Sequence, residues 1–181
     1  MQKSRLSLYR LVFTGLFAAL IFVGTFFFKI PTIGYIHLGD GFIFIAASIL
    51  PLPYAMAAAA LGGGLADLLG GYAIWIPGTM IIKALCVVLF NNKAKKALCW
   101  RNILAVLFAA VVNIAGYYLY GSLIQGNFIT CLTEIPMNAA QETAGAIIFI
   151  VMALLLNVNP ALHSFIMRKI NGSNNESSDK M

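Results

Sequence analysis

Charged residues are scarce in this chain, and their scarcity excludes a soluble globular domain. Only 10% of the 181 residues are Asp, Glu, Lys or Arg, whereas 61% are hydrophobic and the mean hydropathy is +0.88. A soluble domain needs more charge than this to give its surface groups that water can solvate. The composition therefore predicts an all-α integral membrane protein embedded in a lipid bilayer.

Patterns that would indicate catalysis or metal binding are also missing. The three cysteines, Cys86, Cys99 and Cys131, form no C-x-x-C pair and have no histidine nearby at ligand spacing, so neither a zinc site nor a disulfide framework is indicated. The chain has no G-x-x-x-x-G-K-[ST] nucleotide loop and no G-x-S-x-G or H-E-x-x-H motif. We therefore expect no enzyme activity, no metal and no cofactor.

Acidic residues are only half as common as basic ones, 6 against 12, which leaves a formal net charge of +6. The basic residues lie in short clusters beside apolar runs, which is typical of topology signals and not of a nucleic-acid interface. The clusters are residues 3–10, residues 93–101 and the pair Arg168 and Lys169. If they are cytoplasmic, an even number of spans places both termini in the cytoplasm.

The apolar runs have room for six transmembrane helices at about 20 residues per crossing. Proline, glycine and polar residues separate them and predict helices over roughly residues 11–28, 40–50, 54–69, 79–90, 102–123 and 138–156. Residues 29–39 and 125–136 are expected to be outer loops, and the last helix to be kinked or to stop near Pro160. We expect one membrane domain, residues 1–170, and a disordered cytoplasmic tail, residues 171–181.

This topology would bring polar and aromatic residues from separate outer segments to one membrane face. The passages concerned contain His37, Asp40, Tyr72, Trp75, Gln125, Glu134 and Asn138. Further candidates follow them at helical spacing, namely Lys83, Asn113, Tyr117, Gln141 and Glu142. Such a convergence predicts a pocket for a small ligand.

Four of these residues have an alternative structural interpretation. Asp40 would cap the helix that follows it, with His37 at the membrane interface. Trp75 would be an interfacial anchor instead of stacking on a planar ligand. Lys83 would extend to the membrane surface instead of facing a ligand. The residue pattern leaves both interpretations open in each case.

Four segments within about residues 8–160 together match a known family of membrane proteins. They are Tyr35-Ile-His-Leu-Gly-Asp40, Ala66-Asp67 before a Gly-Tyr-x-Ile-Trp-x-Pro turn, Ile82-Lys83, and Pro136-x-Asn-x-x-Gln141. In these segments the chain resembles the substrate-binding S components of energy-coupling factor (ECF) transporters. The resemblance implies a six-helix protein of the cell membrane that captures a vitamin or vitamin precursor from outside. It also implies a transmembrane coupling subunit and two cytoplasmic ATPase subunits that drive uptake.

The resemblance further implies where ligand and partner bind. Family sites use the first outer loop and helices four to six, which corresponds here to His37, Asp40, Trp75, Lys83, Asn113, Asn138 and Gln141. In the family an Ala-x-x-x-Ala pattern on the first helix docks on the coupling subunit. The matching spacing here is Gly15 and Ala19, with Thr14 and Ala18 alongside, although packing against the protein's own helices explains the same spacing.

Two questions about function stay open at this point. The expected ligand is a small, planar, polar nutrient, with hydroxymethylpyrimidine, another thiamine precursor or a pyridoxine-like vitamin as the best guess. The alternative function is an autonomous secondary transporter of a small nutrient, driven by protons through His37, Asp40 and Glu142. Uptake without any ATPase, abolished by an uncoupler, would distinguish it.

Overall fold

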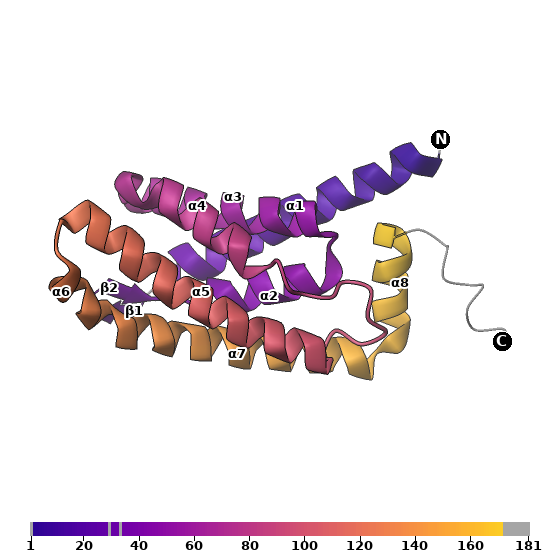
Figure 1. The fold of residues 1–181 in the computed structure, drawn as a ribbon. Coiled ribbons are helices and arrows are strands. Elements are labelled where there is room, and N and C mark those ends of the chain that lie inside the picture. The colour runs from indigo at the N-terminus through magenta and orange to yellow at the C-terminus, as the bar shows by residue number, and fades with distance from the viewer. Residues whose placement is uncertain (1, 29, 33, 172–181) are drawn as a thin grey trace.

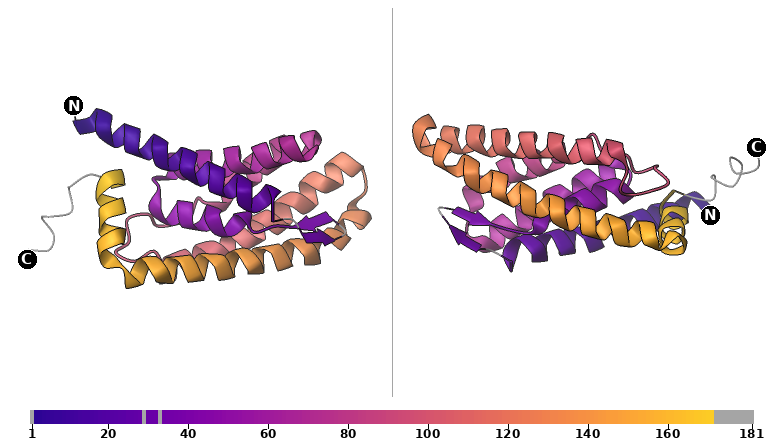
Figure 2. Two further views of the ribbon diagram at one scale, coloured as in Figure 1. Left: turned by 180° about the vertical axis from the view of Figure 1, so that it is seen from behind. Right: turned by 90° about the horizontal axis from the view of Figure 1, so that it is seen from below.

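The computed structural model describes residues 2–28, 30–32 and 34–171, which form a bundle of helices along one long axis (Figure 1). The elements are α1 (Gln2–Phe26), β1 (Ile30–Thr32), β2 (Gly34–Ile36), α2 (Gly39–Ile49), α3 (Leu52–Gly70), η1 (Ala73–Trp75), α4 (Ile76–Cys86), α5 (Trp100–Gln125), α6 (Phe128–Cys131), η2 (Leu132–Glu134), α7 (Ile135–Val158) and α8 (Pro160–Asn171). The β1–β2 hairpin and α6 lie at one end of the bundle, and α8 crosses the other end (Figure 2).

Helix α2 is the most enclosed element of the fold. All of its residues except Phe42 are buried, and it contacts α1, α3, α7 and α8. A helix that is apolar on all sides is stable only inside a larger assembly of helices. Its 11 residues extend over about 16 Å, roughly half of the thickness of the hydrocarbon core of a bilayer. The rest of the bundle is arranged around this short central helix.

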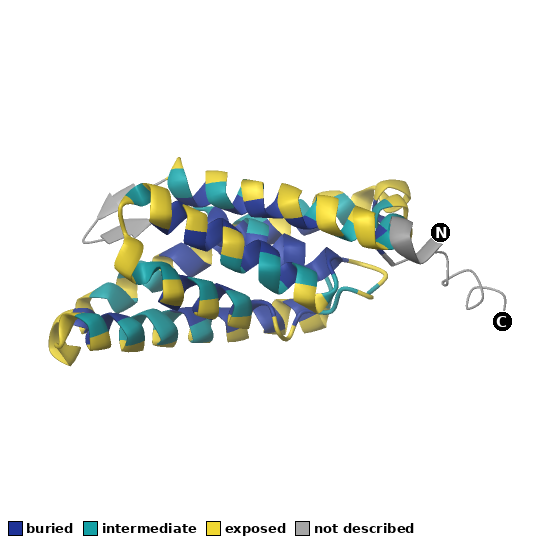
Figure 3. Cartoon of the chain, turned by 90° about the horizontal axis from the view of Figure 1, so that it is seen from above, coloured by how far each residue is buried: buried dark blue, intermediate teal, exposed yellow. Residues whose placement is uncertain are grey.

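The outer surface of the bundle is apolar. Four helical segments are long and apolar enough to cross a membrane, namely Leu6–Phe26, Leu52–Gly70, Trp100–Gln125 and Phe128–Val158, and two shorter apolar ones are Gly39–Ile49 and Ala73–Cys86. The exposed side chains on these helices are mostly large and hydrophobic, while the buried residues face the interior (Figure 3). This is the arrangement of a multi-pass membrane protein; six crossings and their orientation stay a prediction.

Helices α1 and α3 pack closely because α3 presents small residues to α1. A Cβ on Gly62 would lie 2.7 Å from the Ile21 Cβ and 2.8 Å from the carbonyl oxygen of Ala18. Ala58 and Ala59 on α3 are completely buried. Small residues at this spacing let two helix backbones approach each other.

The last helix expected from the sequence is divided at Pro160, as predicted. α7 ends at Val158, and α8 begins in a new direction with the side chain of Asn159 accepting a hydrogen bond from the Leu162 N–H at 3.0 Å (Figure 1). The Arg10 guanidinium donates to the carbonyl oxygen of Ile170 at 2.8 Å and so ties α8 to α1. Both ends of the described chain therefore lie at the end of the bundle opposite the hairpin.

The described fold is all-helical except for one short hairpin, and both segments expected to be outer loops contain regular structure. Residues 30–32 and 34–36 form an antiparallel hairpin in which Pro31 pairs with Tyr35. Within the second loop, Asn127 caps the short helix α6 by accepting hydrogen bonds from the backbone N–H groups of Ile129 and Thr130. The expected disordered tail lies outside the described residues except for Asn171, which ends α8.

The close contact between α1 and α3 predicts opposite outcomes for two glycine substitutions. Gly62→Ala should lower the free energy of unfolding by about 1–3 kcal/mol, because the new methyl group overlaps the backbone of α1. Gly15→Ala is the matched control: nothing lies within 4 Å of a Cβ there, so the better helix propensity of alanine should leave stability unchanged or raise it. Thermal unfolding of the detergent-purified variants measures both, and equal midpoints would contradict the packing argument.

Candidate functional site

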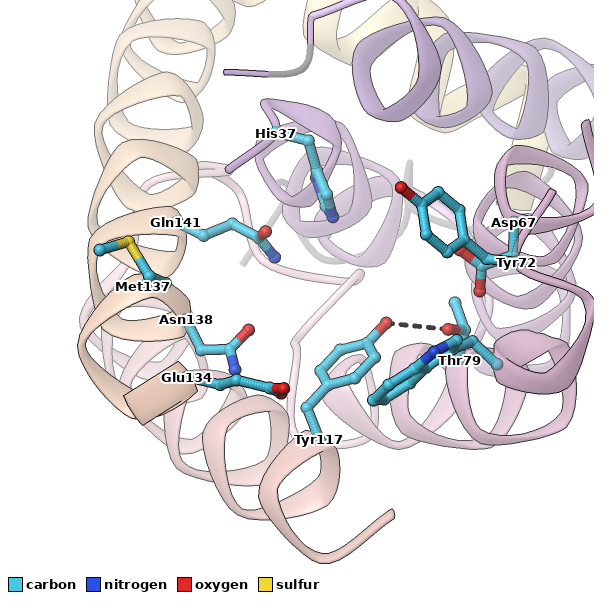
Figure 4. Close-up of a pocket in the computed structure, with 10 residues that line it drawn as sticks. His37, Asp67, Tyr72, Thr79, Tyr117, Glu134, Met137, Asn138 and Gln141 are labelled. Atoms are coloured by element: carbon cyan, nitrogen blue, oxygen red, sulfur yellow. Dashed lines mark hydrogen bonds between the residues drawn. The ribbon is translucent and has the colours of Figure 1, made fainter. Parts of the chain in front are cut away.

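A cavity lies at the end of the bundle that carries the hairpin and α6. Its lining comes from the residue after β2, the end of α3, the turn before η1, η1 itself, α4, α5, η2 and the start of α7. The lining residues are His37, Asp67, Tyr72, Trp75, Thr79, Tyr117, Glu134, Met137, Asn138 and Gln141. Side chains from distant parts of the sequence point into the same space in Figure 4. The pocket for a small ligand was predicted from the sequence at this end of the molecule.

One side of the cavity is aromatic. The ring of Trp75 lies 6.1 Å from that of Tyr117 and 5.9 Å from that of Tyr120, measured between centroids. Tyr117 is held in place by a 3.1 Å hydrogen bond from its hydroxyl to Thr79 (Figure 4). A Cβ on Gly78 would overlap the ring of Tyr120, so the glycine makes room for this cluster. The indole of Trp75 is thus part of the cavity wall, and an aromatic ring in this place can stack on a planar ligand.

The opposite side is polar and belongs to the first turns of α7. Pro136 stands in the first turn, where its missing N–H costs nothing, and it fixes the direction of the helix. Asn138 and Gln141 then fall one turn apart and both face the cavity. At the rim, the Gln125 amide donates to the carboxylate of Glu134 at 3.2 Å. The cavity therefore presents amide and carboxylate groups opposite an aromatic wall.

Behind the cavity lies a buried network centred on an ion pair. Lys83 Nζ lies 2.6 Å from Asp40 Oδ1 and donates a second hydrogen bond to Asn113 Oδ1 at 2.8 Å. The other carboxylate oxygen of Asp40, Oδ2, accepts a hydrogen bond from Gln141 Nε2 at 2.7 Å. Each of these four residues is at most 4% exposed. The network joins α2, α4, α5 and α7 at one point.

This network decides two of the alternatives that the sequence left open. The N-cap of α2 is Leu38 without a side-chain hydrogen bond, so the capping interpretation of Asp40 is wrong. Lys83 is only 2% exposed, so it does not extend to the surface. Both charges stay buried because each compensates the other.

The structure divides the expected site residues into two groups. His37, Trp75, Tyr117, Asn138 and Gln141 line the cavity. Asp40, Lys83, Asn113 and Glu142 lie behind it, and Glu142 is 3% exposed on the same helix as Gln141.

Five lining residues were not among the candidates for ligand contact, although Tyr72 and Glu134 belong to the outer passages from which the pocket was predicted. The five are Asp67, Tyr72, Thr79, Glu134 and Met137. Helical spacing was the available signal for Thr79, which lies four residues from both Trp75 and Lys83. Met137 precedes Asn138 and carries no polar group that would single it out. The remaining three lie in or next to the outer passages that the topology brought together.

The small residues of α1 fall on two different faces. Thr14 and Ala18 are 7% and 8% exposed, and the Thr14 hydroxyl donates to the carbonyl oxygen of Arg10 at 2.7 Å. Gly15 and Ala19 are exposed. Only the second pair is accessible to another protein.

Comparison with protein families gives a match over most of the chain. A family model described as "ECF-type riboflavin transporter, S component" matches residues 5–158. No curated protein matches the chain. The match agrees with the resemblance based on the segments from Tyr35 to Asp40 and from Pro136 to Gln141.

The buried ion pair predicts strong coupling between Asp40 and Lys83. Lys83→Met should lower the free energy of unfolding by about 3–5 kcal/mol, because it leaves the Asp40 carboxylate buried without a counter-charge. The double variant Asp40→Asn/Lys83→Met should recover most of that loss. Lys93→Met, at an exposed position, is the control and should have no effect. Thermal unfolding measures all three; a double variant no more stable than Lys83→Met would contradict the coupling.

Proposed function

The chain belongs to the family of S components of ECF-type riboflavin transporters, and from this we propose that it captures riboflavin or a close analogue from outside the cell membrane. S components are transporter subunits and not enzymes. Uptake would be driven by a transmembrane coupling subunit and two cytoplasmic ATPase subunits. The observation that carries the choice of ligand is the aromatic wall around Trp75 facing the amides of Asn138 and Gln141 across one cavity.

The chemistry of a flavin suits these two walls. Its ring system is flat and largely apolar, and one edge carries alternating carbonyl and N–H groups. The ring could stack on Trp75 while the polar edge is hydrogen-bonded by the amides of α7. A thiamine precursor or a pyridoxine-like vitamin has the same two features on a single ring. The description of the family favours riboflavin over these smaller compounds, which serve as competitors in a binding test.

The charge of the lining favours a ligand without phosphate. Asp67 and Glu134 contribute carboxylates, and none of the described residues that line the cavity is Lys or Arg. The nearest buried cation, Lys83, is already paired with Asp40. A phosphate group in this cavity would face these two carboxylates, and His37 is the one described lining residue whose side chain can carry a positive charge. The free vitamin is therefore the preferred form over its phosphate ester.

The two tryptophans of the chain give a direct test of ligand position. Trp75 lines the cavity, whereas Trp100 begins α5 and is 74% exposed. In a Trp100→Phe variant, riboflavin should quench most of the remaining tryptophan fluorescence with a saturating, stoichiometric titration. In Trp75→Phe the quenching should be lost, because the remaining indole lies near the opposite end of a 26-residue helix. Equal quenching in the two variants would contradict the assignment of the cavity.

We also propose that the exposed pair Gly15 and Ala19 contacts the coupling subunit. Both lie on the outer face of α1 among exposed apolar side chains such as Val12 and Leu16. Small residues four apart on such a face allow a second helix to approach closely. Thr14 and Ala18 are buried in the same helix and are not part of this contact.

This docking proposal predicts that binding and uptake separate. Gly15→Leu/Ala19→Leu should reduce ATP-driven riboflavin uptake by vesicles that contain all subunits by about tenfold or more, while riboflavin binding to the purified chain is retained. Ala115→Leu, at an exposed position of α5, is the matched control and should leave uptake unchanged. Normal uptake by the double variant would contradict the proposal. Uptake without ATPase subunits would instead support the proton-coupled alternative.

A further inference from the structure

The side-chain amide of Gln141 has a fixed polarity. Its partner atom in the buried network is Asp40 Oδ2, at 2.7 Å. The Asp40 carboxylate is paired with Lys83 at 2.6 Å, so its oxygens act only as hydrogen-bond acceptors. The group that Gln141 turns toward Asp40 must therefore be its NH₂. The carbonyl oxygen of the amide is left for the other side.

Gln141 cannot reverse this orientation at low cost. A rotated amide would place its carbonyl oxygen against the carboxylate of Asp40, and both groups are buried. Asp40 is held in place by its ion pair with Lys83, which also donates a hydrogen bond to Asn113 at 2.8 Å. α2 cannot withdraw from α7 either without breaking a tight contact, since a Cβ on Gly145 would lie 2.9 Å from the Asp40 Cβ.

The carbonyl oxygen of Gln141 is in a position to meet a ligand. The residue lines the cavity although it is only 4% exposed (Figure 4). Its one side-chain hydrogen bond to the described residues is the bond from Nε2 to Asp40. A buried acceptor of this kind gains free energy when a ligand supplies a donor, and it loses free energy when the ligand cannot.

We propose that Gln141 is a hydrogen-bond acceptor of fixed orientation that selects a ligand carrying a ring N–H, with Asp40, Lys83 and Asn113 as the positioning residues. The inference rests on the proposed function and adds the atom that is recognised. The oxidised flavin ring has a single N–H, at N3, between two carbonyl groups. Gln141 accepts from this N–H.

The test compares riboflavin with N3-methylriboflavin, which has the same ring face and hydroxylated chain but no ring N–H. Binding of both is measured with the full chain in detergent. For the wild-type protein we expect riboflavin to bind about tenfold to a hundredfold more tightly than the methylated compound. Part of this ratio is steric, so variants are needed to isolate the hydrogen bond.

Gln141→Met has almost the same volume and removes the acceptor. It should weaken riboflavin binding by about fivefold to fiftyfold and change the binding of N3-methylriboflavin by less than about threefold, so that the ratio falls. Trp75→Phe is the matched control: it should weaken both compounds to a similar extent and leave the ratio unchanged, because stacking involves the ring face that they share.

A second variant tests the positioning role without altering the cavity lining. In Asp40→Asn/Lys83→Met the two charges of the ion pair are removed together, and the new amide can either donate to Gln141 or accept from it. The orientation of Gln141 is then no longer fixed. The ratio of the affinities for riboflavin and N3-methylriboflavin should therefore fall, although Gln141 is present.

Two failures of this experiment are distinguishable. In the first, Gln141→Met and Asp40→Asn/Lys83→Met both bind riboflavin and both keep the wild-type ratio of the affinities for riboflavin and N3-methylriboflavin. This result would overturn the inference and leave the proposed function standing. Absence of riboflavin binding to the wild-type chain would overturn the proposed function and this inference with it.

Discussion

The ion pair between Asp40 and Lys83 is the constraint on which the rest of the structure depends. Two charges can remain in an apolar interior only if they meet each other and their remaining hydrogen-bonding capacity is also used. Asn113 and Gln141 supply those additional partners. α2, α4, α5 and α7 must therefore converge at this point, and the cavity lies next to it at the end of the bundle that carries the hairpin. The stability of the bundle and the shape of the site have the same origin.

Residues without bulky side chains make that convergence possible. Gly145 lets α7 approach Asp40, Gly62 lets α3 approach α1, and Gly78 leaves room for the ring of Tyr120 beside Trp75. In a membrane, helices are not driven together by the hydrophobic effect, so close packing of this kind and buried polar contacts have to hold the bundle. Each glycine thus acts on the site through the distance between two helices.

Much of this arrangement could be predicted from the sequence, because proline, glycine and charge mark the ends of membrane helices strongly. The topology expected from the sequence was enough to predict that His37, Trp75 and Asn138 lie near one another. Which polar residues face the ligand could not be predicted, since Asp40 and Lys83 are separated by 43 residues and only the packing shows that they neutralise each other. The hairpin was missed because three-residue strands have too few side chains to show an alternating pattern.

The same packing separates the cavity from the proposed partner surface on α1. Ala18 on the inner face packs on Gly62 of α3, whereas Gly15 and Ala19 face outward. The C-terminal end of α3 carries Asp67 to the cavity. The α1–α3 pair therefore has the proposed partner surface on one side and contributes to the cavity at its end. Substitutions on the outer face of α1 can change docking without touching the cavity, because the α1–α3 contact lies between them.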